Sequence, residues 1–238
     1  MPLPKISTPT YELEIPSTKK KIRYRPFLVK EEKILIIAME SQSDTEIANA
    51  VKDVLSTCIL TKGVKVDTLS TFDIEYLFLN IRGKSVGEDV EVLVTCPDDN
   101  KTKVPVRINL DDIKIITHND HKRDIKLDDS LLMRMRYPSI NEFIKSNFST
   151  SEVKSEDTFD LIISCIEQIY NDEESWSTSD CTKEEMNDFL DQLNSNQFKE
   201  IEKFFDTMPK LSHTLTVNNP NTNVKSDIKL EGLAAFFA

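Results

Sequence analysis

Apolar residues are densest between Ser70 and Glu88, where the sequence STFDIEYLFLNIRGKSVGE leaves almost no polar face. A helix that is apolar nearly all round belongs inside a domain. Ser70 followed three positions later by Asp73 is a suitable N-terminal capping pair. The pattern therefore predicts a central core helix that starts at Ser70. We expect it to end within the polar and glycine-containing residues that follow, Arg82, Gly83, Lys84 and Gly87.

Three other regions alternate apolar and polar residues with the period of two that is typical of β-strands. Each contains two such runs separated by a polar turn with a proline, so we expect three β-hairpins. They span Tyr11–Tyr24, Asp89–Leu110 and Leu211–Leu230. The segment 111–135 is less regular, and we expect irregular or edge strands there.

Helical spacing of apolar residues predicts the remaining helices. They are expected at Val29–Met39, from Ser43 to about Ile59, from Ser139, at about Ser155–Tyr170, from Thr182, and from Ser195 to Pro209. An acidic loop, Asn171–Asp180, is expected to carry the only tryptophan.

Strands and helices are segregated, without the βαβ alternation of a parallel sheet. The sequence therefore predicts an α+β protein, a helical bundle with three β-hairpins and an acidic helical C-terminal half. We expect residues 1–137 to form an N-terminal α+β region with the core helix and two hairpins. Residues 138–238 would form a helical region that ends in a hairpin and an apolar tail. The alternative is one continuous domain.

The composition, with 39% hydrophobic and 30% charged residues, is that of a soluble globular protein. No apolar run reaches the roughly 18 residues needed to span a bilayer, and the N-terminus lacks the apolar core of a secretory signal. We therefore expect a protein that stays in the cytosol and makes no membrane contact. None of the four cysteines, Cys58, Cys96, Cys165 and Cys181, belongs to a CxxC pair, so reduced thiols are expected.

The net charge of −11 argues against nucleic-acid binding, which needs clustered Lys and Arg. The charge is unevenly placed. Residues 1–30 hold seven basic and two acidic residues, whereas residues 151–206 hold four basic and sixteen acidic ones. Two solvated faces of opposite sign would explain this distribution. The alternative is a protein whose ends meet different partners, steered by charge.

No motif indicates an enzyme, a cofactor or a small-molecule substrate. The four glycines do not form a phosphate-binding loop. His118 and His121 have a spacing that two metal ligands could use, yet the remaining ligands are missing and a surface loop is favoured. Cys96-Pro97 resembles the start of a zinc knuckle without its second cysteine. His213 falls in a strand pattern and is expected to be structural.

Partner contacts are therefore the expected chemistry. The basic residues of the first hairpin are one candidate set: Lys19, Lys20, Lys21, Arg23 and Arg25. Trp176 in the acidic segment and Phe236-Phe237 near the C-terminus are candidate anchors, because aromatic residues often mark interfaces. The competing explanation is that these aromatic side chains fold back onto the core.

Three stretches carry a resemblance to a known family. They are YELEIPSTKKKIRYRPFLVKEEKILIIAMES near the start, DIEYLFLNIRGKSVGE around the core helix, and MPKLSHTLTVNNPNT with LEGLAAFF near the end. In this order they resemble the baseplate hub proteins of T-even-type contractile-tailed bacteriophages. That family includes a hub subunit and a related hub assembly catalyst, whose catalysis concerns assembly and implies no covalent chemistry.

The resemblance implies phage tail morphogenesis by protein–protein contacts, as a central hub subunit or a hub assembly factor. The alternative is a transient chaperone of the tail tape-measure or hub proteins that is absent from the mature virion. The expected partners are other baseplate hub or tape-measure proteins. The expected location is the host cytoplasm during assembly and, for a structural subunit, the virion tail baseplate.

Overall fold

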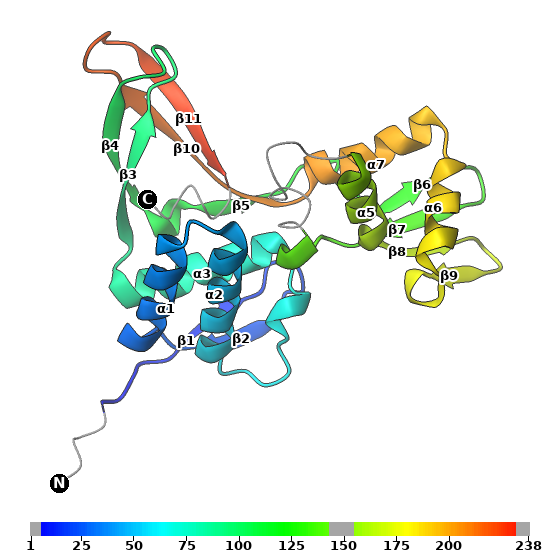
Figure 1. Cartoon of the computed structure of the whole chain (residues 1–238), viewed down its shortest axis with the longest axis horizontal. Helices are drawn as coiled ribbons and strands as arrows, with labels where there is room; N and C mark the ends of the chain where they lie inside the picture. The colour runs from blue at the N-terminus through cyan, green and yellow to red at the C-terminus, as the bar shows by residue number, and fades with distance from the viewer. Residues whose placement is uncertain (1–5, 143–154, 232–238) are drawn as a thin grey trace. The chain divides into compact units, whose positions relative to one another are not determined.

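The computed structural model describes residues 6–142 and 155–231, which divide into two compact units. Unit 1 contains residues 6–116 and 210–231, and unit 2 contains residues 117–142 and 155–209 (Figure 1). This grouping differs from the expected division at residue 137, because the C-terminal hairpin packs with the N-terminal part of the chain. Both units combine helices with antiparallel strands, so the α+β class is confirmed.

Unit 1 holds three small sheets, three helices and two 3₁₀ turns. In chain order its elements are β1 (Tyr11–Glu14), β2 (Lys21–Tyr24), α1 (Val29–Glu40), α2 (Asp44–Cys58), η1 (Val66–Thr68), α3 (Thr71–Val86), β3 (Asp89–Thr95), β4 (Lys103–Asn109), η2 (Leu110–Asp112), β5 (Lys114–Ile116), β10 (Lys210–Asn218) and β11 (Lys225–Glu231). The three predicted hairpins are confirmed as β1–β2, β3–β4 and β10–β11.

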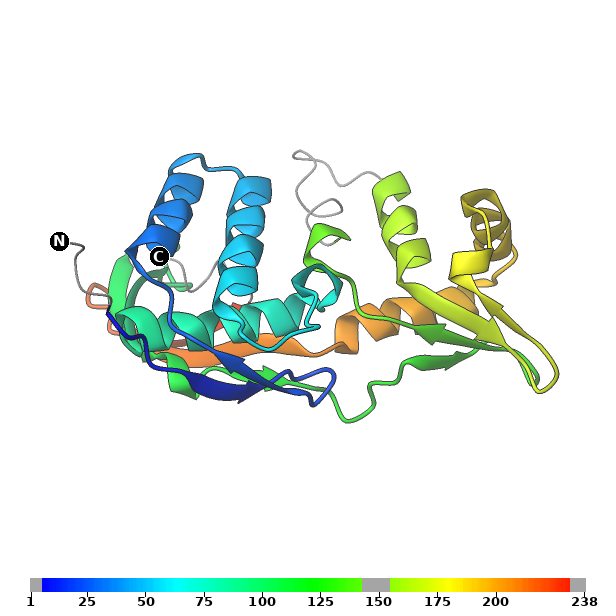
Figure 2. The same ribbon diagram turned by 90° about the horizontal axis from the view of Figure 1, so that it is seen from below.

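Helix α3 lies at the centre of unit 1, as predicted. Ser70 is its N-cap and accepts a hydrogen bond from the backbone N–H of Asp73. The helix contacts α2, β5, β10 and η2, and Figure 2 shows it between the α1–α2 pair and the β1–β2 hairpin. Its buried residues are Phe72, Asp73, Ile74, Glu75, Leu77, Phe78, Leu79, Ile81 and Gly83.

Helix α3 ends at the last of the expected positions. The helix continues through Arg82, Gly83 and Lys84 and ends only at Val86. Gly87 follows with φ +115°, a conformation that favours glycine, and its N–H donates to the carbonyl of Gly83. A single glycine lowers helix propensity by only about 1 kcal/mol, so burial of the surrounding helix outweighs Gly83.

A buried carboxylate fastens the first hairpin to α3. Asp73 Oδ1 accepts from the backbone N–H of Ser17 at 2.9 Å, and Oδ2 accepts from the hydroxyls of Ser17 and Ser70, each at 2.5 Å. Buried charges need such compensation, because desolvation is costly. The β1–β2 turn is therefore held in one position against the N-terminus of α3.

Two hairpins of unit 1, β3–β4 and β10–β11, lie side by side (Figure 1) and share a buried apolar core. The shared core of β3–β4, β5 and β10–β11 contains Val90, Val92, Val94, Cys96, Ile108, Leu110, Ile113, Leu211, Leu215 and Val217. The hairpin turns are also joined. Asp98 accepts from the Asn219 amide at 3.0 and 3.1 Å and from the Thr222 hydroxyl at 2.5 Å. Asn219 is completely buried, so polar contacts close this end of the core.

Unit 2 is a four-stranded antiparallel sheet of order β6-β7-β8-β9 with helices packed on it. Its elements are β6 (Asp124–Lys126), β7 (Leu132–Met135), α5 (Ser155–Cys165), β8 (Ile166–Tyr170), β9 (Ser175–Ser177), η3 (Thr178–Asp180), α6 (Lys183–Asp191) and α7 (Ser195–Thr207). Its core joins sheet residues such as Met133, Met135 and Ile166 to Met186, Ile201 and Phe204 of the helices.

The predicted helix over Ser155–Tyr170 is wrong in its last third. The helix ends at Cys165, and Ile166–Tyr170 forms β8 between β7 and β9. Ile166 and Ile169 satisfy helical spacing and also suit a buried strand, so periodicity could not separate the two. Pairing with two neighbouring strands decides the outcome. The predicted acidic loop is likewise shorter, since β9 occupies Ser175–Ser177.

Removing a side chain from the buried centre of α3 should unfold unit 1 more easily. Leu77→Ala and Phe78→Ala are each expected to lower the free energy of unfolding by about 2 to 5 kcal/mol, because each leaves a cavity. Urea denaturation followed by circular dichroism measures this. Val86→Ala, at an exposed position of the same helix, should cost less than about 0.5 kcal/mol. Losses below that value at both Leu77 and Phe78 would mean that this face of α3 is not buried.

Loss of the Asp73 carboxylate should detach the first hairpin from α3. Asp73→Ala is expected to cost at least about 2 kcal/mol, since each hydrogen bond to a charged group contributes about 1.5–3 kcal/mol. The matched control is Asp67→Ala, which removes an exposed carboxylate 3.5 Å from Lys52 and should cost less than about 1 kcal/mol. Equal losses in the two variants, measured by the same denaturation, would contradict this role for Asp73.

Candidate protein interface

The β1–β2 hairpin presents a group of cations, two in its turn and two on β2. Lys19, Lys20, Lys21 and Arg23 are all exposed. The turn is closed by backbone hydrogen bonds from Lys19 N–H to the Ile15 carbonyl and from Ile15 N–H to the Lys20 carbonyl, at 2.8 and 2.9 Å. Since Asp73 holds Ser17 of the same turn, the lysines extend from a rigid base. Such an arrangement suits contact with an acidic protein surface.

Arg25 does not join this group. Its guanidinium donates to Glu31 Oε1 at 2.8 Å, and the side chains of both residues are largely buried. Burial by itself would raise the pKa of Glu31, but hydrogen bonds from Arg25 and the Leu28 backbone outweigh it and lower the pKa to about 2. Arg25 thus secures the start of α1, and the exposed basic set comprises the other four predicted residues.

Trp176 lies at the edge of the unit 2 sheet. It is the central residue of β9, directly opposite Ile169 of β8. Side chains of opposing residues share a face of the sheet, and Ile169 belongs to the unit 2 core. Trp176 nevertheless keeps 41% of its surface exposed. Trp176 therefore shares a sheet face with a core residue while its indole stays exposed, and its contact with a partner remains a prediction.

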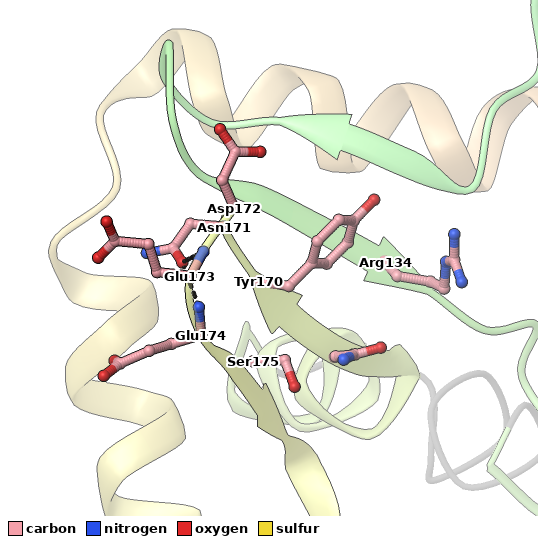
Figure 3. Close-up of a pocket in the computed structure, with 8 residues that line it drawn as sticks. Arg134, Tyr170, Asn171, Asp172, Glu173, Glu174 and Ser175 are labelled. Atoms are coloured by element: carbon pink, nitrogen blue, oxygen red, sulfur yellow. Dashed lines mark hydrogen bonds between the residues drawn. The ribbon is translucent and has the colours of Figure 1, made fainter.

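A shallow open depression of about 390 Å³ lies beside the β8–β9 turn (Figure 3). Its lining residues are Arg134, Gln168, Tyr170, Asn171, Asp172, Glu173, Glu174 and Ser175. Arg134 is already paired with Asp124 at 2.7 and 3.1 Å, and the Tyr170 hydroxyl donates to the same carboxylate. Figure 3 shows the carboxylates of Asp172, Glu173 and Glu174 pointing away from Arg134. The depression is polar, open and acidic, unlike the enclosed apolar pockets of small-molecule sites.

The acidic character extends over all of unit 2. Within the bounds 117–209 the sequence has 10 basic and 21 acidic residues, whereas the rest of the chain has 20 of each. The whole net charge of −11 thus belongs to unit 2. The predicted charge asymmetry is sharper in the structure than along the sequence, because the C-terminal hairpin returns to unit 1.

Helix α1 shows an exposed apolar surface that the sequence prediction did not identify. Its buried residues are Glu31, Leu35 and Ala38, while Ile36 and Ile37 are 49% and 66% exposed. The signal was present in the sequence. The run Ile34-Leu35-Ile36-Ile37 goes all the way round a helical turn, so its four side chains cannot all face one core.

The remaining candidate anchors, Phe236 and Phe237, lie outside the residues that the structure describes.

His121, one of the two histidines considered as metal ligands, has a structural explanation in the described part of the chain. The ring nitrogens of His121 lie 3.0 Å from the Thr207 hydroxyl and 3.1 Å from the Tyr137 hydroxyl. The ring also packs against Tyr137 and Phe204. Among residues 6–142 and 155–231, no group of three or more His, Cys, Asp or Glu residues is placed to hold a metal ion.

Cys96 also belongs to a core. Its side chain is completely buried in the cluster between the two hairpins of unit 1. Its N–H donates to the Thr102 carbonyl at 2.8 Å, and its carbonyl accepts from Asn100 N–H. Asp99 fixes the same turn by accepting from Lys101 and Thr102. Hydrogen bonds thus close the turn in which a zinc knuckle would place its metal.

Among the described helices, none combines the length and the apolar character that crossing a bilayer requires.

The exposed features described above are a basic turn, an apolar helix surface and an acidic sheet edge. All three are of the kind that contacts proteins.

Protonation of His121 should weaken unit 2. Burial lowers the pKa of His121, with a smaller contribution from the Arg123 charge. A histidine whose pKa is lower in the folded than in the unfolded protein stabilises the fold. This stabilisation is complete above the pKa of the unfolded state, about 6.5, and it is lost as the pH falls below that value. We therefore expect unit 2 to be less stable towards urea at pH 5.5 than at pH 7.5.

Fluorescence of Trp176, the only tryptophan, reports unfolding of unit 2 specifically. The control is His121→Gln, which keeps a polar side chain and removes the titration. Its stability should change less between the two pH values than that of the parent protein. An equal pH dependence in both proteins would rule out His121 as the titrating group.

Comparison with known proteins gave one family match. The family model described as T4 bacteriophage base plate protein matches residues 8–238, which is nearly the whole chain. No curated protein and no solved structure matched significantly.

Proposed function

Because the chain belongs to the T4 bacteriophage base plate protein family, we propose that it acts in phage tail morphogenesis at the central hub of the baseplate. It would do so as a hub subunit or a hub assembly factor, through protein–protein contacts. The single observation that carries this proposal is the family match over residues 8–238, which covers both units.

The surfaces of the two units support a role in contacts between proteins. Unit 1 offers the cations Lys19, Lys20, Lys21 and Arg23 and the exposed apolar residues of α1. Unit 2 offers carboxylates around the β8–β9 turn and the half-exposed Trp176. Opposite charges on different units suit a protein that joins two different neighbours, because complementary charge speeds and orients docking. We propose other baseplate hub proteins or the tape-measure protein as those neighbours.

The second candidate is a transient chaperone of the hub or tape-measure proteins that leaves before the virion is complete. The acidic charge of unit 2 favours this role, since contacts between exposed charges are weak and reversible. Both candidates act in the host cytoplasm during assembly. They differ in whether the protein remains in the virion tail.

Mass spectrometry of purified particles separates the two candidates. A hub subunit should be present in particles in a fixed stoichiometry to other baseplate proteins. A transient chaperone should be abundant in the infected-cell lysate and absent from particles. Absence of the protein from tail assemblies and from complexes with tail proteins in the lysate would overturn both.

The same measurement tests the basic turn. A variant with Lys19→Glu, Lys20→Glu and Lys21→Glu should reduce incorporation into particles, or into complexes with tail proteins, at least about tenfold, because it replaces attraction by repulsion. Its matched control is Lys62→Glu with Lys65→Glu, which changes exposed lysines elsewhere in unit 1. Equal incorporation of the two variants would show that the basic turn is not part of the interface.

A further inference from the structure

Exposed apolar side chains in the described residues are concentrated in one short segment. Fourteen large hydrophobic residues are exposed, and six of them lie between residues 28 and 39. They are Leu28, Val29, Ile34, Ile36, Ile37 and Met39. Scattered exposed apolar residues need no explanation, whereas a concentration of this kind marks an interaction surface.

Helix geometry places three of these residues, Val29, Ile36 and Ile37, along one side of α1. Positions seven apart on an α-helix lie nearly above one another, which aligns Val29 with Ile36 and Lys33 with Glu40. Ile37 lies beside them. This set, which we call the α1 stripe, consists of Val29, Lys33, Ile36, Ile37 and Glu40. Val29 and Ile37 are each 66% exposed, so the stripe is open along its length.

The α1 stripe faces away from the rest of unit 1. The helix packs against α2, and its buried residues Glu31, Leu35 and Ala38 lie on the opposite side. Figure 2 shows α1 and α2 side by side above α3, with the outer side of α1 uncovered by other elements of unit 1. Among the described residues, neither Lys33 nor Glu40 forms an ion pair.

The order of residues within the stripe indicates what covers it. If two copies of α1 lie antiparallel about a twofold axis between Ile36 and Ile37, Ile36 of each copy faces Ile37 of the other. The same axis brings Lys33 of each copy opposite Glu40 of the other. In this register the lysine of each copy meets the glutamate of the other. The stripe is therefore complementary to itself, as a twofold interface requires. A parallel arrangement would instead oppose like charges.

The charge distribution also agrees with a second copy of the chain as the partner that covers the α1 stripe. Unit 1 has 20 basic and 20 acidic residues and is neutral overall, whereas unit 2 carries the entire net charge. Two copies therefore meet without net repulsion between their first units, while contact through unit 2 would oppose two strongly acidic surfaces. We propose that the protein forms a homodimer through antiparallel packing of the α1 stripes of two copies.

Analytical ultracentrifugation of the full-length protein over a range of concentrations tests the dimer. The parent protein should show a reversible monomer–dimer equilibrium. Ile36→Ser with Ile37→Ser should raise the dissociation constant at least about tenfold, because it removes the apolar centre of the contact. The control is Leu93→Ser, at an exposed apolar residue of β3, which should leave the dissociation constant unchanged. Circular dichroism verifies that each variant is folded.

Charge reversal tests the antiparallel register. Lys33→Glu alone and Glu40→Lys alone should each weaken the dimer roughly threefold or more, since each creates two like-charge pairs across the axis. The double variant restores opposite charges and should dimerise like the parent protein. Failure of the double variant to recover would overturn the proposed register.

Other outcomes assign the stripe to a different occupant. A parent protein that stays monomeric at every concentration overturns the homodimer. Dimerisation that appears only after deletion of residues 232–238 would assign the stripe to the chain's own C-terminal segment, and would equally overturn it. Because these experiments use the purified protein alone, their failure leaves the proposed role in tail morphogenesis unaffected, and loss of that role leaves the dimer unaffected.

Discussion

An apolar helix with no side for water constrains the whole of unit 1. Since α3 buries residues around its full circumference, other elements must cover it on every side. Helix α2, strands β5 and β10 and the first hairpin do so, and they come from segments far apart in the chain. The cost of leaving such a surface in water is about 25 cal/mol per Å². Coverage of α3 therefore explains why the C-terminal hairpin returns to the N-terminal half.

Apolar contact alone would not fix how these elements meet, because hydrophobic packing has little directionality. Carboxylates supply the direction at three points. Asp73 fixes the first hairpin turn, Glu31 fixes the entry to α1 through Arg25, and Asp98 joins the turns of the two packed hairpins. In each case a short polar side chain connects residues that are distant in sequence or at the start of an element. The exposed lysines of the first turn gain a defined position from this arrangement.

Local sequence signals predicted the features that depend on neighbouring residues. Ser70 with Asp73 marks the start of α3, the helix expected from Thr182 begins there, and alternation located all three hairpins. Features decided by distant partners were not predictable in this way. The strand at Ile166–Tyr170 depends on β7 and β9, and the burial of Arg25 depends on the folding back of Glu31. Among the candidate interface residues, the exposed lysines and Trp176 follow from local sequence patterns, whereas the α1 stripe does not, because a run of apolar residues predicts a helix without showing which side the core covers.

The path of the chain through its two units has a consequence for biosynthesis. Unit 2 occupies one continuous segment, whereas unit 1 needs β10 and β11 to complete the core of its hairpins. A ribosome therefore releases every residue of unit 2 before unit 1 can close. Until then the apolar face of β3–β4 is exposed, and such intermediates are prone to aggregate. The acidic unit 2, folded early, would act as a built-in solubilising segment during translation, because like charges keep nascent chains apart.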